Sequence, residues 1–164
     1  MSRRRGDRDQ PATPPSGSAR LAALRLLGRR DYSSAELTTR LIDRGYPADE
    51  VHTAIEQLTA DRAIDDRRTA FAHVRQAARI KGRGTHRIRR ELEARGLPPA
   101  IVRDALEQVS PDDDAAAIKR FLARRGRPGP LEPAERRRLF QQLLRRGFPA
   151  ALIGRALALD LPDE

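Results

Sequence analysis

The stretch Arg44-Gly45-Tyr46-Pro47 recurs as Arg95-Gly96-Leu97-Pro98 and again as Arg146-Gly147-Phe148-Pro149. Successive copies lie 51 residues apart, and apolar residues on both sides of the phrase keep the same spacing. Before it stand Leu37, Ile88 and Leu139, and after it stand Val51, Val102 and Ile153. Self-similarity at a fixed period is the signature of a structural repeat, so the sequence predicts three copies of one unit.

Each copy of the phrase has the composition of a corner between two helices. Arginine stabilises the negative end of the first helix, and glycine adopts the left-handed conformation that ends it. Proline then sets the φ angle at the start of the second helix. Apolar residues four apart, such as Leu37 and Leu41 before the corner, mark a buried face on each helix. The predicted structural corners are Gly45, Pro47, Gly96, Pro98, Gly147 and Pro149.

A further amphipathic stretch precedes each pair of helices, at residues 19–29, 65–81 and 112–125. Ser33, with Glu36 three residues later, predicts an N-cap. We interpret the acids at 65–66 and 112–114 as caps, because negative charge stabilises helix N-termini. The sequence therefore predicts an all-α fold of three tandem three-helix repeats that form an elongated, curved helical array.

Composition divides the chain further. Residues 1–17 carry Pro, Gly, Ser and charge with almost no apolar side chains, so we expect a disordered basic tail. The predicted repeats are residues 18–61, 62–110 and 111–160, with a Pro/Gly loop at 126–133 in the third and a short tail at 161–164.

The net charge of +10 is unevenly distributed: it is −1 over the first predicted repeat, +6 over the second and +5 over the third. Such a distribution favours a polyanionic partner, because Lys and Arg that displace counterions from phosphates gain affinity. A simpler interpretation remains open. Arginine outnumbers lysine 31 to 2, a bias that a GC-rich coding sequence produces without any binding role.

The sequence lacks the patterns of catalytic and cofactor sites. It has no cysteine, and His52, His73 and His86 have no metal-binding spacing. Lys81-Gly82-Arg83-Gly84 follows no strand and fits neither phosphate-loop pattern. We therefore expect no enzyme activity, no metal and no cofactor. No apolar run approaches the length of a secretory signal or a membrane span, so we expect a cytoplasmic protein without a membrane partner. We also expect a monomer.

Basic residues of the central repeat form the candidate binding surface. Arg68, Arg75 and Arg79 recur on one stripe of the helix expected over 65–81, beside its apolar face. Other cations occupy the following corner and helix. The predicted filament or nucleic-acid-binding surface comprises Arg68, Arg75, Arg79, Lys81, Arg83, Arg87 and Arg90. A solvated helix face is the alternative meaning of these charges.

Several motifs resemble the RecX family of regulatory proteins. The central repeat resembles the family in Ile64-Asp65-Asp66, Phe71-Ala72, Lys81-Gly82-Arg83-Gly84, Arg87-Ile88-Arg89-Arg90-Glu91-Leu92 and Arg95-Gly96-Leu97. Ser34-Ala35-Glu36-Leu37 resembles the first repeat, and Arg146-Gly147-Phe148 the closing one. The resemblance implies a protein that lies in the groove of the RecA recombinase filament on single-stranded DNA. It further implies that the protein limits filament activity and so regulates DNA repair, recombination and the SOS response, with direct DNA contact possible.

Two other functions remain open from the residues alone. Three-helix units with a glycine corner can form helix-turn-helix modules, which favours direct nucleic-acid binding. Against this, residues 149–160 carry Arg155 as their only cation, which is little for a recognition helix. The second alternative is a helical-repeat adaptor for another protein, whose binding would be insensitive to salt.

Overall fold

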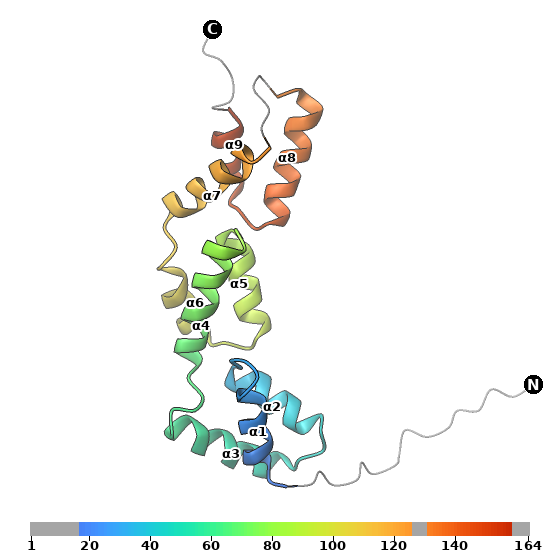
Figure 1. Ribbon diagram of the computed structural model, residues 1–164, viewed down its shortest axis with the longest axis vertical. Coiled ribbons are helices and arrows are strands. Elements are labelled where there is room, and N and C mark those ends of the chain that lie inside the picture. The colour runs from blue at the N-terminus through green and yellow to red at the C-terminus, as the bar shows by residue number, and fades with distance from the viewer. Residues whose placement is uncertain (1–16, 126–130, 159–164) are drawn as a thin grey trace, which may run out of the picture. The chain divides into compact units, whose positions relative to one another are not determined.

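The computed structural model describes residues 17–125 and 131–158, and all regular structure in these residues is helical (Figure 1). The chain separates into two compact units, one ending at Asp65 and one beginning at Asp66. The expected tail before residue 17, residues 126–130 of the loop predicted at 126–133, and the tail at 161–164 lie outside the described residues.

The helices follow one another in the order that the repeat predicts. The first unit contains α1 (Ala19–Leu27), α2 (Ser34–Ile42) and α3 (Ala48–Ala60). The second contains α4 (Asp66–Arg75), the π-helical segment η1 (Gln76–Ile80), α5 (Thr85–Ala94), α6 (Pro99–Leu106), α7 (Pro111–Ala123), α8 (Pro133–Arg145) and α9 (Ala150–Ala158). The prediction of an all-α fold built from three-helix repeats is confirmed in the described residues.

Each set of three helices encloses its own apolar cluster. Leu37, Leu41 and Leu58 are fully buried in the first cluster. Ile88 and Leu92, at the positions corresponding to Leu37 and Leu41, are fully buried in the second cluster, and Leu143, which also corresponds to Leu41, is fully buried in the third. The period of 51 residues is therefore a period of core positions, as expected when each repeat buries the same helix faces.

All three corners have the expected backbone. Gly45, Gly96 and Gly147 have φ angles of 88°, 69° and 86°. The amide after each glycine donates to the carbonyl five residues earlier, as from Tyr46 to Leu41 at 3.2 Å. This is the Schellman arrangement, which satisfies carbonyls at the end of a helix. Each corner glycine therefore ends its helix in the left-handed conformation.

Two helices begin with reciprocal capping boxes. Ser33 Oγ accepts from the Glu36 amide at 3.0 Å, and the Glu36 carboxylate accepts from the Ser33 amide, as predicted. Ser110 and Asp113 make the same pair of bonds at the start of α7. Helix α7 therefore begins before the predicted residue 112, because Ser110, rather than an acid, supplies the cap.

The helix predicted over 65–81 is not a uniform α-helix. Its last turn is the π-helical η1, where the Lys81 amide donates to Gln76 O at 3.2 Å. A π turn inserts an extra residue and shifts the following side chains around the helix axis. Ala77 stays buried, whereas the large apolar side chain of Ile80 is 78% exposed.

The second and third repeats are joined at the start of α5. The Gly84 amide donates to Arg146 O at 2.9 Å, and the His86 amide donates to Gly147 O at 3.0 Å. The corner between α8 and α9 thus satisfies amides at the N-terminus of a helix in the preceding repeat. Both glycines are buried, and a Cβ at Gly84 would overlap the backbone of Gly147.

Asp114 strengthens this joint from the other side. Its carboxylate accepts from the Thr85 hydroxyl at 2.6 Å and from the Thr85 amide at 3.4 Å. The prediction that Asp114 caps its own helix was wrong, because its side chain serves the N-terminus of α5. Burial raises the pKa of Asp114, and the hydrogen bonds from Thr85 offset this only in part.

Candidate functional site

The seven predicted binding residues lie along a continuous path from α4 to α5. Arg68 and Arg75 belong to α4, Arg79 to η1, Lys81 and Arg83 to the corner, and Arg87 and Arg90 to α5. Five of them are exposed, whereas Arg83 and Arg87 are half-buried.

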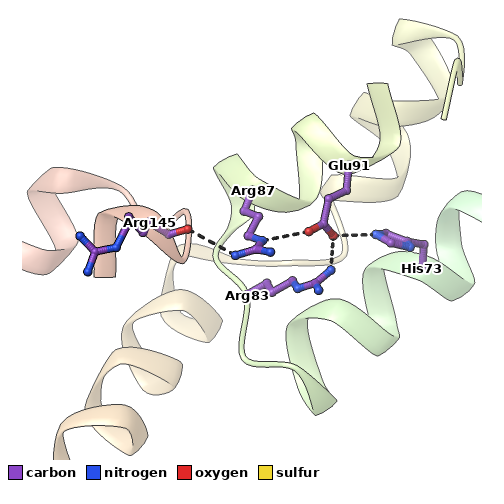
Figure 2. Close-up of polar contacts among 5 residues, drawn as sticks. All are labelled: His73, Arg83, Arg87, Glu91 and Arg145. Atoms are coloured by element: carbon purple, nitrogen blue, oxygen red, sulfur yellow. Dashed lines mark hydrogen bonds and ion pairs between the residues drawn. The ribbon is translucent and has the colours of Figure 1, made fainter. Parts of the chain in front are cut away.

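Arg83 and Arg87 are engaged within the fold, as Figure 2 shows. Arg83 Nη1 lies 2.5 Å from Glu91 Oε2, and Arg87 Nε lies 2.9 Å from Glu91 Oε1. His73 Nε2 reaches the same carboxylate from α4 at 3.0 Å. Arg87 also donates to the carbonyl of Arg145 at 3.5 Å, which connects this cluster to the end of α8.

Glu91 is therefore the centre of a charge cluster that holds α4, the corner and α5 together. Burial alone would raise the pKa of Glu91, but hydrogen bonds from Arg87, His73 and Arg83 outweigh this effect and lower it. Arg83 and Arg87 share the negative charge of this one carboxylate. They therefore contribute less positive charge to the protein surface than the exposed cations do. The spacing of Arg87 and Glu91, four residues apart on one helix, was the sequence signal for this pairing.

Arg75 and Arg79 line a small hollow between α4, η1, the turn after α6, and α7. It has a volume of about 60 Å³, and its apolar lining is Val74, Ala78, Val109 and Ala117. Asp113 also lines it, and hydrogen bonds from Ser110 lower the pKa of its carboxyl group. Both arginines remain exposed at the rim.

Sequence reasoning missed the arginines that the third repeat adds to this side of the unit. Arg120, Arg124, Arg125 and Arg146 line a second, larger cleft together with Arg79 and Lys81. Arg120 and Arg124 are four residues apart at the end of α7, a spacing that places them on one helix face. Arg146 had been assigned only to the end of its helix.

The histidines and acids of the described parts of the chain do not gather into a metal site. Within residues 17–125 and 131–158, no group of three His, Asp or Glu side chains could hold a metal ion. His52 is exposed and pairs with Glu56 at 3.1 Å, whereas His73 belongs to the Glu91 cluster. None of the helices in these residues is long and apolar enough to cross a membrane.

Comparison with known proteins gives consistent matches over most of the chain. The family model "RecX, first three-helix domain" matches residues 19–58, and "RecX, second three-helix domain" matches residues 65–106. Regulatory protein RecX of Chromohalobacter salexigens is 37% identical over 149 residues, which cover 91% of this chain and 93% of that protein. Regulatory protein RecX of Halorhodospira halophila is 37% identical over 153 residues, covering 91% and 92%.

Comparison with solved structures also finds RecX proteins. The crystal structure of RecX from Lactobacillus salivarius superposes with a TM-score of 0.72 at 21% identity, covering 86% of this chain and 95% of that one. At this identity the likeness concerns the fold alone, and the sequence matches carry the assignment. With its two matched three-helix domains and its relatives over nearly their full length, this chain belongs to the RecX family of regulatory proteins.

Proposed function

We propose that this protein binds the RecA recombinase filament on single-stranded DNA in the cytoplasm and limits its activity. It does so as a monomer through binding alone, without catalysis or a cofactor. The observation that carries the proposal is the group of exposed cations on the central repeat of a chain that belongs to a regulatory family. Arg75, Arg79, Lys81 and Arg90 form no ion pair within the described residues.

Electrostatics supports a nucleoprotein partner. Exposed like charges repel one another, and this repulsion is relieved when an anionic surface approaches. DNA within a filament presents such a surface, and steering by opposite charge accelerates encounter. We expect these cations to control association, whereas Arg83 and Arg87 maintain the fold through Glu91.

The test is a double charge reversal with a matched control. Arg75→Glu with Arg79→Glu should abolish inhibition of the filament's ATP hydrolysis. Arg25→Glu with Arg29→Glu changes the net charge equally, also four residues apart and at exposed positions, but in the first unit. The control should retain most of the inhibition. Circular dichroism should show unchanged helicity in both variants, because exposed charges contribute little to stability.

The outcomes separate a site from a general charge effect. Equal losses in the two variants would mean that total charge alone drives association, and the proposed surface would have to be withdrawn. Binding of the unmodified protein should also weaken steeply with salt, because release of counterions contributes a slope of about −0.7 per phosphate contact on single strands. Salt-insensitive binding would instead favour the adaptor function.

A further inference from the structure

The cleft between the second and third repeats has an unusual charge. It encloses about 250 Å³ between η1, the following corner, α7 and the end of α8, and we call it the inter-repeat cleft. Ten residues that the structure describes line it, and of these none is an acid and six are cations, namely Arg79, Lys81, Arg120, Arg124, Arg125 and Arg146.

Most of these cations lack a counter-charge inside the protein. Arg79, Lys81, Arg120 and Arg124 form no ion pair within residues 17–125 and 131–158. Asp113 interacts electrostatically with Arg79 and Arg120, but its carboxylate already accepts a hydrogen bond from the Ser110 amide at 2.9 Å. Gathering several uncompensated cations around one hollow costs energy, and a multivalent anion in the hollow removes this cost.

Phe121 organises two of the arginines. The guanidinium of Arg146 lies 4.6 Å from the centre of its ring and that of Arg125 lies 4.8 Å from it. Gln142 Oε1 holds Arg125 further, accepting from Nη2 at 2.6 Å. Cation–π contacts of this length fix a guanidinium without neutralising it. The two charges are thereby positioned in advance, which lowers the entropy that a ligand must overcome on binding.

We propose that the inter-repeat cleft binds a ligand with linked phosphates, recognised by its phosphate groups and not by bases. Guanidinium groups match phosphate oxygens in geometry and charge. Because two guanidinium groups already cover the ring of Phe121, that ring acts as a support for arginine and not as a stacking surface. Phe121 is a positioning residue. Linked phosphate groups occur both in a free oligophosphate and in the backbone of a nucleic acid.

The experiment uses the full chain without recombinase, so it stands apart from the proposed function. Calorimetric titration with inorganic tripolyphosphate measures the first source, and anisotropy of a labelled oligothymidine strand measures the second. Arg120→Glu with Arg124→Glu should weaken binding by about tenfold or more. Arg103→Glu with Arg138→Glu makes the same charge change at exposed positions outside the cleft and should weaken it by about threefold at most.

Each result supports the proposal or overturns it. If tripolyphosphate binding is lost in the cleft variant and not in the control, the ligand is a free oligophosphate. If only the oligothymidine strand shows this pattern, the ligand is a nucleic-acid backbone. Failure of both probes to bind at low salt would overturn the proposal, as would equal losses in the cleft and control variants.

Variants of Phe121 test its role if the reversal disturbs folding. Phe121→Leu should weaken anion binding, because it removes the ring that orients Arg125 and Arg146, and Phe121→Tyr should restore it. Equal binding by the leucine and tyrosine variants would exclude a positioning role for the ring.

Discussion

Replacing Gly84 by alanine tests the joint between the second and third repeats. Gly84 has a φ angle of −78°, which any residue adopts, so the substitution introduces no backbone strain of its own. The added Cβ would overlap the carbonyl group of Gly147 and the amide of Phe148. The two segments must therefore move apart, and the bonds from Gly84 to Arg146 and from His86 to Gly147 are lost or stretched.

The expected magnitude follows from these two bonds and one opposing effect. Each backbone hydrogen bond contributes about 0.5–1.5 kcal/mol net, so losing both costs about 1–3 kcal/mol. Alanine also restricts the unfolded chain, which stabilises the protein by about 0.4–1 kcal/mol. The loss of contacts is the larger effect, and we expect Gly84→Ala to destabilise by about 1–2 kcal/mol.

Urea unfolding monitored by circular dichroism measures the change, with Gly154→Ala as control. Gly154 lies within α9, and a Cβ there would meet no atom within 4 Å. Alanine at this helical position should stabilise the protein by about 0.5–1 kcal/mol. The two substitutions are chemically identical and should have opposite signs. A Gly84→Ala protein as stable as the unmodified one would refute the close backbone contact.

Four further predictions concern stability. Gly96→Val should lower the free energy of unfolding by about 1–3 kcal/mol, because a β-branched residue would be forced to a φ of 69°. Ser33→Ala should cost about 1 kcal/mol in the same assay, through loss of the α2 capping box. The other two predictions concern pH. The pKa of Glu91 is lowered, so the ionised carboxylate stabilises the fold above the ordinary glutamate pKa, and this stabilisation is lost as the pH falls through the folded-state value. Glu91→Gln should remove this pH-dependent loss of stability. The pKa of Asp114 is raised, so the free energy of unfolding should fall as the pH rises from the ordinary aspartate pKa through the folded-state value. Asp114→Asn should abolish this fall, as measured by urea titrations over the acid range.

The sequence predicted those parts of the fold that depend on neighbouring residues. The corners at Gly45, Gly96 and Gly147 were recognised because positive φ and helix ends have a local signature in glycine and proline. The capping box at Ser33 was found for the same reason. The π-helical turn of η1 was not predicted, because residues 76–80 have an ordinary helical pattern and the widening is visible only in the backbone.

The candidate site was predicted less completely, because the charge of a side chain does not show whether it pairs with another residue of the fold or faces solvent. Arg83 and Arg87 were grouped with the exposed cations, yet their partner Glu91 also lies in the motif that suggested binding. Asp114 lies 29 residues from its partner Thr85, so no local pattern could join them. The inter-repeat cleft combines Lys81 with Arg146 across two repeats, and only tertiary packing places them together.

The hydrogen bonds from the Gly84 and His86 amides to the third corner also mean that the second repeat depends on the chain as far as Gly147. A premature stop codon before Arg146 would remove the carbonyls of Arg146 and Gly147, so the first turn of α5 would depend on water for its amides. The damage would reach back into the repeat that carries the exposed cations, and a shortened product should be a substrate for proteases and not a weaker regulator. An intact last repeat therefore protects the one before it, because the carbonyls of its corner complete the start of α5.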